Sequence, residues 1–204
     1  PPQPYPRAVA FAQCASNITV PSGVTLTVVP GQVIKFPGGS SAVGSLIVNG
    51  TLQAPGTAAK PVVFTSTRDD TFGGDSNNDG PTSELFRGVW GGIEFAPGST
   101  GSVLDHTVVR YGGSGRNSHL LYVNSGELSL TNSVVGDANV NALRIENSNP
   151  VVRGNTFQGS VGGPAITMDL LSDPLFLANT FVNNFVNAVV LDGGELPGNT
   201  TWND

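Results

Sequence analysis

Leu121-Tyr-Val-Asn124, Leu143-Arg-Ile-Glu146, Ile166-Thr-Met-Asp169 and Val189-Val-Leu-Asp192 decide the fold of this chain. Each segment reads apolar, variable, apolar, polar, and its third residue follows the previous copy by 22, 23 and 23 residues. A constant period of about 20–50 residues is typical of repeat architectures, in which each repeat packs on its neighbours. It favours a solenoid, with each strand beside its next copy, over a sandwich of hairpins. We therefore expect these third residues to stack as one internal apolar ladder.

A second track of segments follows the first: Asn132-Ser-Val134, Asn155-Thr-Phe157 and Asn179-Thr-Phe181, spaced by 23 and 24 residues. Asn tolerates the left-handed backbone conformation that a sharp bend between strands requires. Its amide can also bond the Asn of the next coil. The spacing predicts a polar ladder of the Asn residues, with His106 in the same place one coil earlier, and an apolar ladder of the third residues.

The first half of the chain repeats more loosely, in short runs rich in Val, Ile and Thr that are separated by Pro and Gly turns. Together with the later repeats, these runs resemble the right-handed parallel β-helix of the pectin-lyase-like superfamily. They are most similar to secreted bacterial β-helix repeat proteins of unassigned activity. The segments that carry the resemblance are Ile18–Gly31, Val33–Phe36, Asn49–Leu52, Pro61–Ser66, Gly88–Ile93 and Val108–Gly113. The resemblance implies the fold and leaves the function open, since this architecture carries lyases, hydrolases, adhesins and spacers.

We expect an all-β protein: one right-handed, single-stranded parallel β-helix domain over residues 1–204, with about seven coils and one inserted acidic loop. Residues 1–15, Pro-rich and then apolar, predict an N-terminal cap. Residues 67–89 break the repeat and predict the inserted loop. Because an open sheet edge is an aggregation hazard, we expect residues 195–204 to fold over the last coil or the native protein to continue. The abrupt ends favour a fragment of a larger protein.

The inserted loop predicts a structural calcium site, because four of the ten Asp residues lie within positions 69–79. Asp75-Ser-Asn77-Asn-Asp79-Gly80 matches the opening of a calcium loop, with oxygen donors at positions 1, 3 and 5 and Gly at position 6. Position 12 is Phe86 in place of the usual Glu, so other acids must complete the shell. The predicted ligands are Asp69, Asp70, Asp75, Asn77, Asp79 and Glu84. The alternative is a solvated acidic turn.

The repeat also predicts a row of acids on the outer surface. The residue after each inward position is polar, and carboxylates on successive coils would lie about 5 Å apart. Such a row raises a pKa by mutual repulsion or recruits a cation. The candidate ligand-binding residues are Tyr122, Arg144, Glu146, Asp169 and Asp192. The alternative is that these residues are solvated strand ends, and we predict no catalytic residue.

Composition excludes several classes of function. Only 12% of residues are charged, the formal net charge is −6, and the nine Lys and Arg are spread thinly, so there is no basic patch for nucleic acid. No apolar run approaches the roughly 20 residues of a membrane span. The single Cys14 excludes an internal disulfide framework.

We expect a non-catalytic module with a structural or adhesive role, secreted or on a cell surface and bacterial, stabilised by calcium in the inserted loop. Its partner would be a polysaccharide or another surface protein. The alternative is a polysaccharide-binding module, or a polysaccharide lyase or glycoside hydrolase that acts on the lateral face. Against an enzyme acting on acidic polysaccharide, the net charge of −6 repels polyuronates.

Overall fold

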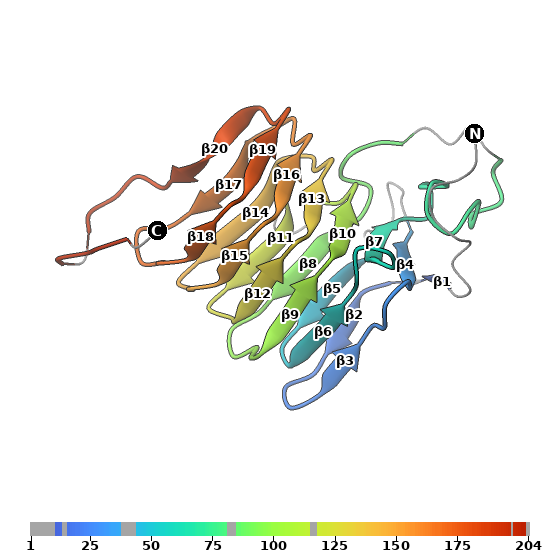
Figure 1. Ribbon diagram of the computed structural model, residues 1–204, viewed down its shortest axis with the longest axis horizontal. Helices are drawn as coiled ribbons and strands as arrows, with labels where there is room; N and C mark the ends of the chain where they lie inside the picture. The colour runs from blue at the N-terminus through green and yellow to red at the C-terminus, as the bar shows by residue number, and fades with distance from the viewer. Residues whose placement is uncertain are drawn as a thin grey trace.

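The computed structural model describes residues 11–13, 16–37, 44–80, 85–114, 118–196 and 198–202. In these residues the chain forms twenty β-strands and no helix, wound as a parallel β-solenoid (Figure 1). Its three sheets run side by side along the solenoid. A helix that could cross a lipid bilayer is therefore not found in the described part of the chain. The all-β prediction is confirmed.

Each turn of the solenoid adds one strand to each sheet, and all listed pairings within the sheets are parallel. Sheet A consists of β1 (Phe11–Gln13), β4 (Val33–Phe36), β7 (Val62–Ser66), β10 (Thr107–Arg110), β13 (Val134–Gly136), β16 (Thr156–Gln158) and β19 (Thr180–Val182). Sheet B consists of β2 (Ile18–Val20), β5 (Ser45–Val48), β8 (Gly92–Phe95), β11 (His119–Asn124), β14 (Asn141–Glu146), β17 (Pro164–Met168) and β20 (Val186–Leu191). Sheet C consists of β3 (Thr25–Thr27), β6 (Thr51–Pro55), β9 (Ser102–Asp105), β12 (Leu128–Thr131), β15 (Val151–Arg153) and β18 (Leu175–Leu177).

The described strands make six complete turns, from β2–β4 to β17–β19, which is close to the seven coils expected. β1 and β20 extend sheets A and B at opposite ends. Within the predicted cap, residues 11–13 form β1, which pairs in parallel with Val33–Lys35 of β4. The rest of the predicted cap, except Ser16's neighbours beyond it, lies outside the described residues: 1–10 and 14–15.

The predicted internal ladder is confirmed. Val123 pairs with Ile145, Ile145 with Met168, and Met168 with Leu191. The first three are almost completely buried in the single large apolar core. Alternation along each strand turns the residues on either side of this ladder outward.

The second predicted apolar ladder is wrong at its first member. Val134 pairs with Thr156, and it is Val135 that pairs with Phe157, which in turn pairs with Phe181. The two segments are 22 residues apart in the structure, whereas alignment of their Asn residues gives 23. Val135 is fully buried, because the inward position of β13 is set by the pleat and not by the Asn before it.

The same shift divides the predicted Asn ladder. Asn155 and Asn179 stack, with the Asn155 Nδ2 donating to Asn179 Oδ1 at 3.0 Å. The place expected for Asn132 is taken by Ser133, whose backbone N–H donates to Asn155 Oδ1 at 2.9 Å. Asn132 instead adopts a left-handed conformation with φ 49°, one position earlier, in register with His106 at φ 45°. Bending and polar stacking are therefore done by adjacent positions.

The inserted loop leaves the solenoid after β7 and returns before β8, as predicted. Its Phe72 packs on the outer face of sheet A, against Val33, Val63 and Val108. Trp90, at the end of the loop, is fully buried and stacks on Phe36 with ring centroids 4.4 Å apart. Its indole Nε1 donates to the Arg110 carbonyl at 2.8 Å. The loop is thus held by packing at both ends.

Candidate functional site

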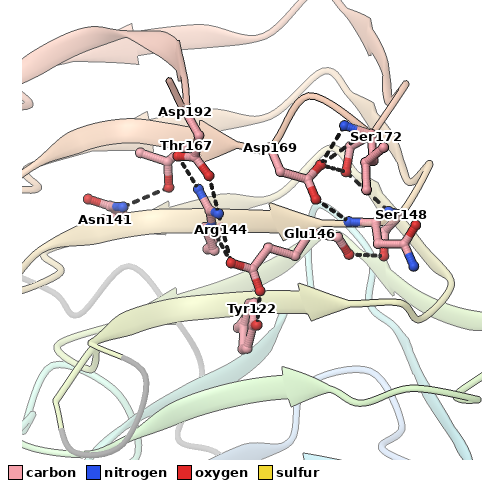
Figure 2. A network of polar contacts seen from close by, with 11 residues as sticks. Tyr122, Asn141, Arg144, Glu146, Ser148, Thr167, Asp169, Ser172 and Asp192 are labelled. Atoms are coloured by element: carbon pink, nitrogen blue, oxygen red, sulfur yellow. Dashed lines mark hydrogen bonds and ion pairs between the residues drawn. The ribbon is translucent and has the colours of Figure 1, made fainter. Parts of the chain in front are cut away.

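A network of polar side chains covers part of the outer face of sheet B (Figure 2). Strand register places Tyr122 of β11 beside Arg144 of β14, and Glu146 lies two residues further along β14. Asp192 follows β20, two coils beyond Arg144. The structure thus brings together four of the five residues predicted for this face.

The Arg144 guanidinium is the centre of the network. Its Nη1 and Nη2 donate to the two carboxylate oxygens of Asp192 at 2.7 and 2.5 Å. Its Nε and Nη2 donate to Glu146 Oε1 at 3.1 and 2.7 Å. The Tyr122 hydroxyl donates to the other Glu146 oxygen. One buried cation therefore holds two carboxylates.

Charge pairing in this network relieves the repulsion that a row of acids would suffer. Hydrogen bonds from Arg144 lower the pKa of the Asp192 carboxyl below its ordinary value. The hydrogen bonds to Asp192 hold the pKa of Arg144 above its ordinary value. Burial, reinforced by Glu146, raises the pKa of the Tyr122 hydroxyl. At neutral pH all members keep one protonation state, so the network is a set of fixed charges.

Asp169 belongs to a different set of contacts. Its Oδ1 accepts hydrogen bonds from the Ser172 backbone N–H at 2.9 Å and the Ser172 hydroxyl at 2.6 Å. Its Oδ2 accepts the Asn147 backbone N–H at 2.9 Å. Figure 2 shows this carboxylate turned toward Ser172 and away from Arg144. Asp169 therefore caps the turn after β17 and links it to the turn after β14.

A small cleft of about 90 Å³ lies on the same face of sheet B, beside Tyr122. Its polar lining residues include Asn17, Ser45, Glu94 and His119. Burial, and then the charge of Arg144, lower the pKa of His119 to about 4, so this imidazole is neutral at pH 7. Sequence reasoning missed His119. Its register with Asn141 on the next coil is the signal that could have placed it on this face.

The inserted loop gathers three of the predicted metal ligands. Asp70, Asp75 and Asp79 each offer a carboxylate oxygen, and these oxygens lie within 4.8 Å of one another. Asp70 Oδ1 and Asn77 Oδ1 are buried without a hydrogen-bond partner. Burial, followed by the charge of Asp75, raises the pKa of Asp70. Glu84 lies outside the described residues.

Asp69 has its own partners, apart from this triad. It is fully buried, and its Oδ2 accepts the Thr65 hydroxyl at 2.7 Å. Its Oδ1 accepts the Thr71 hydroxyl at 2.5 Å, and Arg110 Nε lies 3.4 Å from Oδ2 in an ion pair. These contacts fix the first residues of the loop to sheet A.

Lys35 lies beneath the acidic loop and was not foreseen. It is fully buried on the outer face of sheet A, and its Nζ donates to the Gly74 carbonyl at 2.6 Å. Burial lowers the pKa of Lys35, and the charges of Asp69, Asp70 and Asp75 oppose that shift. No sequence pattern connects Lys35 with a loop 39 residues away.

Three comparisons, with models of protein families, with curated proteins and with solved structures, gave no match to this chain. The parallel β-solenoid is therefore assigned from the strand pairings themselves. No relative's site can be transferred to the residues described above, so their chemistry has to be judged from their own contacts.

Proposed function

We propose that this chain is a non-catalytic β-helix module of the pectin-lyase-like kind, with a structural or adhesive role in a secreted or cell-surface bacterial protein. One observation carries the proposal. The three acids predicted for the outer face, Glu146, Asp169 and Asp192, are all engaged by other groups of the protein. The composition and the family resemblance support the location.

Acid–base catalysis requires a group whose pKa lies near the working pH. The Asp192 carboxyl has a lowered pKa, the Tyr122 hydroxyl a raised one, and the His119 imidazole a pKa of about 4. Each shift moves its group away from neutrality. The network therefore supports rigidity of the solenoid better than it supports proton transfer.

The proposal includes a calcium ion that braces the inserted loop. Four carboxylates, from Asp69, Asp70, Asp75 and Asp79, face the two cations Lys35 and Arg110, which leaves a charge of −2 among these six groups. A divalent cation would neutralise that charge, and calcium prefers oxygen ligands of this kind. Asp70, Asp75, Asn77 and Asp79 would hold it, with further ligands from outside this group.

Calorimetric titration with calcium, before and after chelator treatment, tests this part. We expect a dissociation constant below about 1 mM, the range of extracellular modules, and a rise in Tm with calcium. The double variant D75N/D79N should lose both effects, whereas E127Q, a carboxylate remote from the loop, should keep them. Absence of binding at millimolar calcium would show that the loop is a solvated acidic turn.

A polysaccharide-binding role is the second candidate, favoured by the polar cleft beside Tyr122. A glycan array, combined with assays for unsaturated products and for new reducing ends, separates the candidates. Turnover of any polysaccharide would refute the non-catalytic proposal. Glycan affinity without turnover, lost in Y122A and kept in R153M, would establish the second candidate, since Arg153 lies exposed on sheet C.

A further inference from the structure

The C-terminal end of the solenoid is an exposed apolar surface formed by β18, β19 and β20. These strands are the last of sheets C, A and B, and each pairs with a neighbour on one side only within the described sheets. Figure 1 shows them together at the end opposite β1, β2 and β3. We refer to the last turn, residues 171–191, as the end face.

Burial falls sharply at the end face. The inward residues Val152, Phe157 and Ile166 of the preceding strands are fully buried. The residues that pair with Val152 and Phe157, namely Phe176 and Phe181, are only partly buried. A hollow of about 460 Å³ opens between them, and Trp202 and Leu191 also line it. The core therefore reaches the surface here.

Ten of the sixteen exposed large apolar side chains of the described residues belong to positions 171–202. Phe185 has the largest exposed fraction of them, 74%. No charged residue occurs between Asp173 and Asp192, and Asp192 itself is paired with Arg144. Soluble proteins usually protect sheet edges with charges, proline or a covering segment. A neutral, apolar edge of three sheets is typical of a surface that is covered by a partner.

We propose that the end face binds the end face of a second copy of this chain, forming a dimer with two-fold symmetry. A two-fold axis perpendicular to the solenoid axis reverses strand direction, so the opposed edges meet as antiparallel pairs. The partner must present three strand edges in the same triangular arrangement, and a second copy does so by construction. The end face has 21 residues, within the roughly 20–30 residues per side of a stable interface.

Charge also favours this occupant. Each copy carries a formal net charge of −6, so contacts between acidic lateral surfaces are opposed by repulsion. The end face lacks charged residues, and the apolar hollow gains from removal of water. Two copies therefore meet with least repulsion at this end.

Sedimentation equilibrium of the whole chain over a range of concentrations tests the proposal. We expect a reversible dimer of twice the 20.9 kDa chain mass. F185K should weaken association by at least about tenfold. V24K, at the opposite end, and F86K, in the inserted loop, are matched controls at exposed apolar positions and should dimerise like the parent. Far-ultraviolet circular dichroism confirms that each variant is folded.

Three results would overturn the proposal. The first is a monomer at every concentration. The second is growth beyond the dimer that V24K abolishes, which would show head-to-tail stacking of unlike ends. The third is dimerisation that F185K leaves unchanged. As a second measurement, hydrogen exchange of backbone amides in β18–β20 should slow as protein concentration rises, while exchange in β3 stays constant.

Discussion

Asp192 holds Arg144 with both carboxylate oxygens across two coils of the solenoid, at 2.7 and 2.5 Å. The two residues are 48 positions apart in the chain. The contact passes over Thr167, which lies between them in the sheet. A single ion pair thus ties three successive strands of sheet B together, in addition to their backbone pairing.

Replacement of Arg144 tests the contribution of this contact. R144M leaves Asp192 and Glu146 without their cation, and we expect a loss of about 1–3 kcal/mol in the free energy of unfolding at pH 7. R153M removes an exposed Arg and should change it by less than about 0.5 kcal/mol. Urea denaturation followed by circular dichroism measures both. Equal effects of the two variants would contradict the role of Arg144.

The pH dependence of the same contact has a definite sign. Hydrogen bonds from Arg144 lower the pKa of Asp192. The stability this provides is complete above the unfolded-state pKa of Asp and is lost as the pH falls through the lower folded-state pKa. The stability difference between the parent and R144M should therefore shrink below about pH 4. A difference that stays constant between pH 7 and pH 2 would exclude the proposed linkage.

Lys35 should show linkage in the alkaline range. Burial lowers the pKa of this ammonium, so its charged form carries a folding cost at neutral pH. That cost is relieved as the pH rises from the folded-state pKa toward 10.5. The stability of the parent relative to K35M should therefore increase over that window. K60M, a substitution of an exposed Lys, is the control, and parallel curves for the parent and K35M would disprove the effect.

The inward Asn position should matter more than the left-handed one. Asn155 is almost completely buried, accepts the Ser133 N–H, and donates to the Leu130 carbonyl at 2.8 Å. N155A leaves these groups unsatisfied, at about 1–3 kcal/mol each. N132G keeps a conformation that Gly adopts freely and should cost less than about 1 kcal/mol. Thermal and urea unfolding rank the two, and the reverse order would contradict the observed register.

The two tryptophans should report separate environments. Trp90 is fully buried against Phe36, and Trp202 is 43% exposed at the end face. In W202F the remaining fluorescence should be blue-shifted and resist acrylamide quenching. In W90F it should be red-shifted and quenched readily, with a loss of stability because the hydrogen bond to the Arg110 carbonyl is removed. Similar quenching of both variants would place Trp90 near solvent.

The fold could be predicted because the repeat is written directly in the sequence. Val123 and Ile145 recur at a spacing that only coil-on-coil pairing explains, and they do pair. The error at Val134 arose because side chains of similar type were aligned, whereas the pleat counts residues from the strand. One extra residue in a corner changes the spacing without changing the strand.

The candidate sites were predicted less completely. Tyr122, Glu146 and Asp192 were placed on one face by counting, but Asp169 lies on the same column and is turned to its own corner. The cations that balance the acids were harder to find. Lys35 approaches Gly74 only because the inserted loop folds back over sheet A.

The sequence by itself determined the solenoid, the identity of its inward ladder and the position of its insertion, because these depend on local periodicity and on pairing between adjacent copies. The tertiary structure alone decided which charges neutralise one another and that the end face is apolar and open. Those features depend on the distances between side chains far apart in the chain, and a hydrogen bond or ion pair forms only when folding brings its two atoms within reach.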